Sequence, residues 1–174
     1  MSRSYLAMVR GPSGSGKTTL CRYWARRAPF NFELLSTDEV QDRVDYPELA
    51  DDAEFEIVLD RVGMEVAGKL PAGPLLVDAG LRDPEHVDRV LELAERGRGD
   101  PDVLLVRLSV EVEEAILRKR DLPEARVREL HMKWQTKPIP DEFVLVTDGI
   151  PEAEVERRFG EILTEKFKPG VARS

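Results

Sequence analysis

Residues 4–18 read S-Y-L-A-M-V-R-G-P-S-G-S-G-K-T and carry the strongest structural signal of this 174-residue chain. An apolar run at 5–9 leads into the pattern G-x-x-x-x-G-K-[ST] at Gly11, Gly16, Lys17 and Thr18. In such a loop the backbone N–H groups of residues 14–18 surround the β-phosphate of a nucleotide, Lys17 reaches the β- and γ-phosphate oxygens, and the Thr18 hydroxyl ligates Mg²⁺. The pattern predicts a nucleoside triphosphate site.

A glycine-rich turn that matches this pattern by chance is the alternative. It does not explain the apolar run before the loop or the helix-compatible stretch L-C-R-Y-W-A-R-R that follows. We therefore expect ATP and Mg²⁺ as ligands. The predicted nucleotide-binding residues of the loop are Gly11, Ser13, Gly14, Ser15, Gly16, Lys17, Thr18 and Thr19.

The composition is that of a globular protein, with 41% hydrophobic and 34% charged residues, and we expect one domain over residues 1–174. Neither an apolar run of membrane-spanning length nor a secretory leader is present, so we expect a cytoplasmic protein without a membrane partner. The single cysteine, Cys21, excludes an internal disulfide, and we interpret it as a small buried residue rather than a reactive thiol.

Five apolar runs alternate with helical patterns, which is typical of a parallel sheet covered by helices on both faces. We predict an α/β fold of the P-loop kinase type with a five-stranded parallel sheet. The expected strands are 5–9, 32–36, 74–79, 102–109 and 142–148. The expected helices are 16–27, 52–69, 84–96, 111–119, 124–135 and 151–167.

Ligands of open α/β sheets bind outside the carboxyl ends of the strands. Asp38 follows the second predicted strand, where a carboxylate can face the γ-phosphate and take the proton of an attacking hydroxyl. The alternative for Asp38 is an N-cap of the helix that begins D-E-V-Q-D-R-V. Asp78 ends the third strand and is predicted to bind Mg²⁺ with Thr18, or to hydrogen-bond Thr18 directly.

Four arginines, Arg118, Arg120, Arg126 and Arg128, flank a helix break at Leu122-Pro123. This arrangement predicts a lid over about 118–135 whose guanidinium groups close over the triphosphate, with at most two of the four acting in catalysis. Arg43 follows Asp38 by one helical turn. It could bind a phosphate of the acceptor, or pair with Glu39 on the same helix.

Taken together, these motifs resemble the small P-loop kinases of the polynucleotide-kinase-like group. The resemblance rests on G-P-S-G-S-G-K-T at 11–18, S-T-D-E-V-Q-D-R-V at 36–44, L-L-V-D-A-G-L-R-D-P-E-H at 75–86 and the lid stretch at 118–134. It implies that Asp38 is the general base, that Arg43 contacts an acceptor phosphate, and that Arg118 and Arg120 bind the ATP phosphates. After Asp78 the relatives usually carry Thr-Asn or Ala-Thr-Asn, whereas this chain has Ala79-Gly80-Leu81.

The first expectation is thus an ATP-dependent kinase acting on a 5′-hydroxyl DNA or RNA end. The net charge of −8 argues against a protein that coats nucleic acid but allows one that grips a strand end. Residues 38–60 carry ten carboxylates and one arginine, which disfavours a long nucleic-acid track. A small-molecule kinase of the same fold is the alternative. An ATPase or nucleotide switch is a third class, which the presence of Asp38 disfavours.

Overall fold

Five parallel strands form the sheet that the sequence predicts, in the order β2-β3-β1-β4-β5. The computed structural model describes residues 4–44, 52–97, 100–133 and 137–168. In chain order the strands are β1 (Tyr5–Arg10), β2 (Glu33–Ser36), β3 (Leu75–Ala79), β4 (Asp102–Ser109) and β5 (Phe143–Val146). After β1 the chain forms β2 and β3 on one side of β1, and then β4 and β5 on its other side. The loop after β1 therefore lies at the switch point of the strand order, where ligands of such sheets bind.

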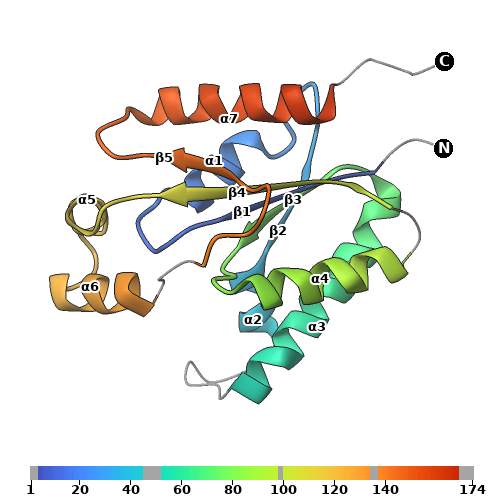
Figure 1. The fold of residues 1–174 in the computed structure, drawn as a ribbon, viewed down its shortest axis with the longest axis horizontal. Helices are drawn as coiled ribbons and strands as arrows, with labels where there is room; N and C mark the ends of the chain where they lie inside the picture. Colours follow the sequence, from blue (N-terminus) through green and yellow to red (C-terminus); the bar gives the residue numbers. More distant parts are fainter. Residues whose placement is uncertain (1–3, 45–51, 98–99, 134–136, 169–174) are drawn as a thin grey trace.

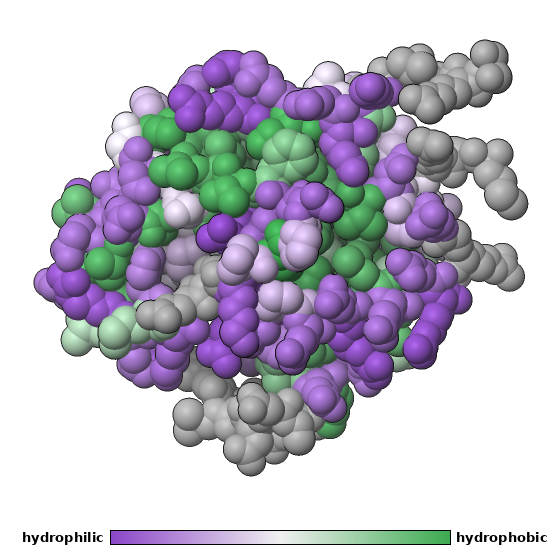
Figure 2. Space-filling model, in the orientation of Figure 1, coloured by the Kyte–Doolittle hydropathy of each residue, from purple (hydrophilic) through white to green (hydrophobic). Residues whose placement is uncertain are grey.

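Helices cover both faces of the sheet, as Figure 1 shows. Side chains of β1 alternate between the faces: Leu6 and Met8 belong to the core on the side of α3 and α4, whereas Ala7 and Val9 belong to the core on the side of α1 and α7. This alternation follows from the two-residue period of a strand. The helices have the bounds α1 (Lys17–Trp24), α3 (Asp52–Lys69), α4 (Pro84–Arg96) and α7 (Glu152–Phe167). In the same orientation, Figure 2 shows apolar residues gathered between α7 and β5, while polar residues cover most of the rest of this face.

Cys21 lies in the core beside α7, fully buried. Burial raises the pKa of its thiol well above the ordinary value, and the nearby Asp78 charge adds to this effect. A thiol held protonated in this way is a poor nucleophile, so the interpretation of Cys21 as a buried packing residue is confirmed.

Most predicted elements are confirmed with small shifts at their ends, and the largest difference is at α1. The predicted helix 16–27 stops at Trp24, because Ala25 is extended and pairs with Phe32 while Arg26 has a φ of 55°. The described residues also form the short elements α2 (Thr37–Arg43), the 3-10 turn Leu70–Ala72 and α5 (Val112–Arg118).

The predicted lid, about 118–135, begins at the last residue of α5 and contains α6 (Glu124–Lys133); both helices project beside the P-loop (Figure 1). Residues 134 and 135 of the expected lid lie outside the described residues. The two helices share a small core of their own, made of Val110, Ala115 and Val127. Because buried apolar area is the main stabilising contribution, this small cluster ties the lid less firmly than the two large cores tie the sheet.

Candidate active site

The loop between β1 and α1 has the backbone that phosphate binding requires. Gly14 and Gly16 have φ values of 81° and 89°, in the left-handed region that glycine adopts without strain. A Cβ at Gly11 would lie 2.7 Å from Ser15 Oγ and 2.9 Å from the Leu108 carbonyl oxygen. The loop ends at Gly16, the N-cap of α1, so the unpaired N–H groups at the start of α1 form an anion site.

Lys17, Thr18 and Asp78 meet where this loop faces the end of β3. The Thr18 hydroxyl donates to Asp78 Oδ2 at 2.7 Å, and Lys17 Nζ lies 3.8 Å from Asp78 Oδ1. The side chain of Lys17 is 15% exposed and that of Asp78 is 6% exposed. The ammonium group therefore reaches the cleft, while the carboxylate lies just beneath it.

Two of these residues, Thr18 and Asp78, fit a bound Mg²⁺. Asp78 Oδ1 is buried and has no hydrogen-bond partner among the described residues, although buried carboxylate oxygens normally have one. A carboxylate oxygen beside a threonine hydroxyl is the kind of ligand that Mg²⁺ takes, and Mg²⁺ usually needs only one or two protein ligands beside phosphates and water. Thr18 and Asp78 are thus suited to hold the ion predicted from the sequence.

Asp38 lies at the start of α2 and does not cap it. The N-cap is Ser36, whose hydroxyl accepts from the Glu39 N–H at 3.4 Å. The buried Thr37 hydroxyl accepts from Gly80 N–H at 2.7 Å and donates to the Asp78 carbonyl oxygen at 3.3 Å. These bonds fix the start of α2 against the end of β3, beside the Mg²⁺-compatible carboxylate.

The Asp38 carboxylate is exposed, and no hydrogen bond or ion pair engages it within the described part of the chain. It lines the same cleft as Lys17 and Thr18. A Cβ at Gly80 would lie 3.1 Å from Asp38 Oδ1, so the glycine at this position leaves room for the carboxylate. Leu81, the next residue, is buried in the core and offers no polar group to the cleft.

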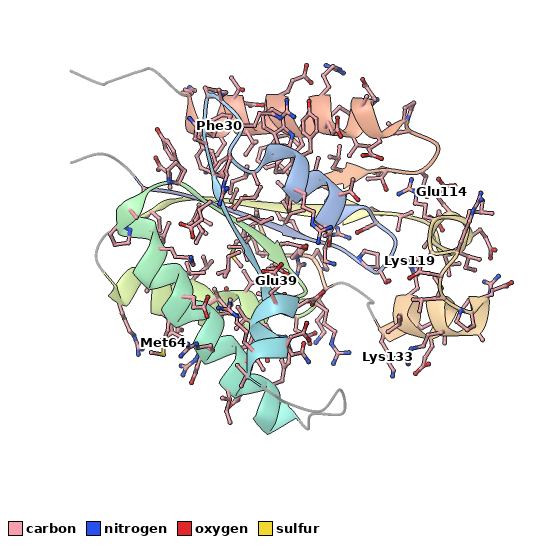
Figure 3. All side chains as sticks on the ribbon, turned by 180° about the vertical axis from the view of Figure 1, so that it is seen from behind. Phe30, Glu39, Met64, Glu114, Lys119 and Lys133 are labelled. Atoms are coloured by element: carbon pink, nitrogen blue, oxygen red, sulfur yellow. The ribbon has the colours of Figure 1, made fainter. Side chains whose placement is uncertain are left out.

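Arg118 is the lid arginine that the structure brings to the P-loop. Its Nη1 donates to Thr147 Oγ1 at 3.0 Å and to the Gly14 carbonyl oxygen at 3.4 Å, and its Nη2 donates to the Thr147 carbonyl oxygen at 2.6 Å. Glu114, one turn earlier on α5, pairs with the same guanidinium at 3.1 Å. Figure 3 shows Glu114 and Lys119 on this side of the cleft, beside the loop that leads into α1.

The other predicted lid arginines point elsewhere. Arg120 donates to the Leu117 carbonyl oxygen, and Arg126 pairs with Glu129 at 2.9 Å. Arg128 pairs with Glu113 and Glu124, and its hydrogen bond lowers the pKa of Glu113. None of these three lines the cleft, so the predicted roles of Arg120 and Arg126 require a movement of the lid.

Arg43 also lies away from the cleft lining. Its Nη2 pairs with Glu65 Oε2 of α3 at 3.0 Å, and its Nε donates to the Glu39 carbonyl oxygen at 3.2 Å. Arg43 thus contacts Glu39, the partner expected on the same helix, through the backbone carbonyl only. The carboxylate that pairs with Arg43 is that of Glu65, on another helix. The side chain remains 58% exposed.

The cleft has a volume of about 810 Å³, enough for a nucleotide and a small second substrate. Apolar groups line the end away from Asp38, where Ile150 and Val155 follow β5. Thr147, fully buried at the end of β5, holds this segment to the P-loop through Arg118. Ile150, Val155 and Lys119 were not predicted as site residues, because an apolar residue or a lone lysine gives no chemical signal in the sequence.

Residues 6–137 match the family described as an AAA domain, AAA_33. The chain belongs to this family. No curated protein matches the chain. The described residues include no helix long and apolar enough to cross a membrane.

Solved structures with low sequence identity to this chain share its fold. A sugar kinase from Janibacter sp. HTCC2649 is 19% identical with a TM-score of 0.70, over 96% of each chain. The Mycobacterium tuberculosis APS kinase CysC, in complex with AMPPNP and APS, is 15% identical with a TM-score of 0.69, over 97% of this chain and 99% of that chain. A chain of the Pnkp1/Rnl/Hen1 RNA repair complex is 18% identical with a TM-score of 0.59, over 78% of this chain and 45% of that chain.

Proposed function

We propose that this protein transfers the γ-phosphoryl group of ATP to a hydroxyl group. The observation that carries the proposal is the convergence of Lys17, Thr18 and Asp38 on one cleft, with Asp78 directly beneath. The P-loop geometry supports a triphosphate, and the exposed carboxylate of Asp38 supports an acceptor that must lose a proton. Similar folds in a sugar kinase and in an APS kinase bound to AMPPNP support the same chemistry.

The chain's own groups divide the work of the reaction. The acceptor oxygen forms a bond to the γ-phosphorus while the bond from that phosphorus to the β-phosphate oxygen of ADP breaks, and the hydroxyl proton passes to Asp38. Lys17 and the N–H groups at the start of α1 offset the charge on the phosphoryl oxygens. Mg²⁺, held by Thr18 and Asp78, supplies further charge neutralisation when bound. Arg118 holds the end of α5 against the P-loop through its hydrogen bond to the Gly14 carbonyl oxygen.

We further propose that the acceptor is a small metabolite. Arg43, which would bind a backbone phosphate of a strand, is paired with Glu65 and lies outside the cleft lining. α2 carries the carboxylates of Asp38, Glu39 and Asp42, and these negative charges would repel the phosphates of a nucleic-acid strand. A compact acceptor has to reach only Asp38 of these three, because Glu39 and Asp42 lie outside the cleft lining.

A 5′-hydroxyl nucleic-acid end is the second candidate acceptor. It is favoured by the exposed guanidinium of Arg43, one turn after Asp38, and by the likeness to a chain of an RNA repair complex. An end-binding enzyme of this kind would contact only one to three phosphates, so its affinity would fall with salt along a shallow slope, roughly −1 to −3 in log–log form.

The test is a labelling screen with γ-³²P-ATP and Mg²⁺ against sugars, nucleosides, other hydroxyl metabolites and 5′-hydroxyl oligonucleotides. We expect label in a small hydroxyl compound, at a rate that changes little between low and physiological salt. Arg43→Ala should leave that rate unchanged, with Arg61→Ala on α3 as the matched control, since Arg61 also pairs with Glu65. Label confined to oligonucleotides, with a raised KM in Arg43→Ala, would overturn the metabolite proposal in favour of the nucleic-acid end.

A further inference from the structure

Arg10, the last residue of β1, is a buried arginine directly before the P-loop. It is 1% exposed, which is unusual for an arginine. Its guanidinium donates to three backbone carbonyl oxygens: Leu81 at 3.4 Å, Arg82 at 3.1 Å and Lys137 at 2.7 Å. The first two belong to the loop between β3 and α4, which begins beside Asp38. The third belongs to the segment that returns from the lid to β5.

Glu142 balances the charge of Arg10. Its carboxylate is 2% exposed, lies 2.9 Å from Arg10 Nε and also accepts from Arg107 Nε at 2.9 Å. The Ile139 N–H donates to the same carboxylate at 3.1 Å. Burying the ion pair of Arg10 and Glu142 is costly unless all its hydrogen bonds are made. Here the two side chains together contact the loop between β3 and α4 and the segment that leads from the lid to β5.

Arg82 extends this set of contacts to the lid. Its Nη1 donates to the carbonyl oxygen of Lys133, the last residue of α6, at 3.3 Å. Lys133 is labelled at the end of the lid in Figure 3. The segment 80–82 is therefore fixed by Arg10 from inside the molecule, and it contacts the end of the lid on the outside.

We propose that Arg10 is a positioning residue that joins the acceptor side of the cleft to the return segment of the lid. This inference rests on the proposed function, because it assigns the loop at Gly80 to the acceptor side through its contact with Asp38. Through Gly80 and Thr37, the position of this loop also sets the position of Asp38. Loss of the Arg10 contacts would let the loop and the return segment move independently, so acceptor binding would weaken before nucleotide binding.

An arginine is required for this role. Its planar guanidinium presents five donors in fixed directions, so it can bind several carbonyl oxygens and a carboxylate at once. A lysine at the same position keeps the charge beside Glu142 but cannot reach all of these acceptors. Arg10→Lys therefore removes the joining contacts while leaving a charge for the buried carboxylate.

The chain offers a matched control in Arg107. It is the β4 residue paired in register with Arg10, and it contacts the same carboxylate at the same distance of 2.9 Å. It donates to no carbonyl of the loop 80–82 among the described hydrogen bonds. Arg107→Lys should thus alter the contact with Glu142 in the same way while leaving the loop 80–82 in place.

The experiment is hydrogen exchange of both variants, with nucleotide affinity and transfer kinetics measured alongside. We expect Arg10→Lys to raise amide exchange in residues 80–83 about tenfold or more, since local opening tracks local contacts, while Arg107→Lys stays within about twofold of wild type there. ATP affinity should stay within about twofold in both variants. With the acceptor from the labelling screen, KM for the acceptor should rise about tenfold in Arg10→Lys alone.

Equal exchange in the two variants, or a uniform rise across the whole sheet in Arg10→Lys, would overturn the proposal. If wild type transfers no phosphoryl group, the proposed function fails, but the exchange comparison still decides whether Arg10 joins the two segments. If Arg10→Lys does not fold, native-state exchange of wild type across denaturant concentration provides the test. Residues 81–83 and 137–142 should then open together with one free energy, and separate openings would contradict the proposal.

Discussion

Replacing Lys17 with alanine is expected to lower the rate of phosphoryl transfer at least about a hundredfold, with little change in the melting temperature. The Lys17 ammonium lies 3.8 Å from Asp78 and reaches the cleft at the position where the triphosphate must lie. It is the charge that can follow the γ-phosphoryl group as negative charge builds up in the transition state. Transfer rate and thermal melting should be measured on the same preparation.

Lys69→Ala serves as the control for this prediction. Lys69 ends α3 and pairs with Glu33, on another side of the molecule, so its removal should leave the transfer rate unchanged. Near-normal transfer by a folded Lys17→Ala protein would remove the P-loop lysine from the mechanism.

Asp38→Asn should abolish transfer while ATP affinity stays within a fewfold of wild type, because the carboxylate acts on the acceptor and not on the nucleotide. Stability should change by about 0.5 kcal/mol at most, the effect of losing one negative charge in the first turn of a helix. The capping alternative for Asp38 is wrong, because the structure gives the N-cap of this helix to Ser36.

Asp42→Asn is the matched control, since Asp42 lies on the same helix one turn further on and outside the cleft lining. It should leave both transfer and affinity unchanged. An Asp38→Asn protein that still transfers phosphate at the wild-type rate would show that the proton leaves by another route.

The fold and the nucleotide half of the site were predictable because their signals are local. The P-loop needs a strand, glycines at fixed spacing and a helix, all of which lie within residues 5–24, and the structure confirms that context at Gly14 and Gly16. Asp38 and Asp78 were found by a rule about strand ends, which needs the order of elements and no side-chain contact. The approach of Asp38 to Gly80, two residues after Asp78, follows from the pairing of β2 with β3.

The rest depends on contacts between distant segments. Arg10 ends an apolar strand, where an arginine side chain normally reaches solvent. Only the fold shows that Arg10 is buried and paired with the buried carboxylate of Glu142. The orientations of Arg118 and Arg126 depend on how α5 and α6 pack, which the composition of the lid does not set. Arg43 of α2 pairs with Glu65 of α3, and the sequence pattern around Asp38 could not indicate a partner on another helix.

In the proposed reaction this cleft passes the γ-phosphoryl group of ATP to a hydroxyl compound and not to water. The most direct measurement is a single turnover of γ-³²P-ATP with excess protein, Mg²⁺ and the acceptor panel, with the label separated into phosphate ester and inorganic phosphate. Transfer to a hydroxyl compound predicts label in an ester formed by wild type, and loss of that ester with both Lys17→Ala and Asp38→Asn. Label that appears only as inorganic phosphate, at a rate that Asp38→Asn does not change, would contradict it and identify the protein as an ATPase.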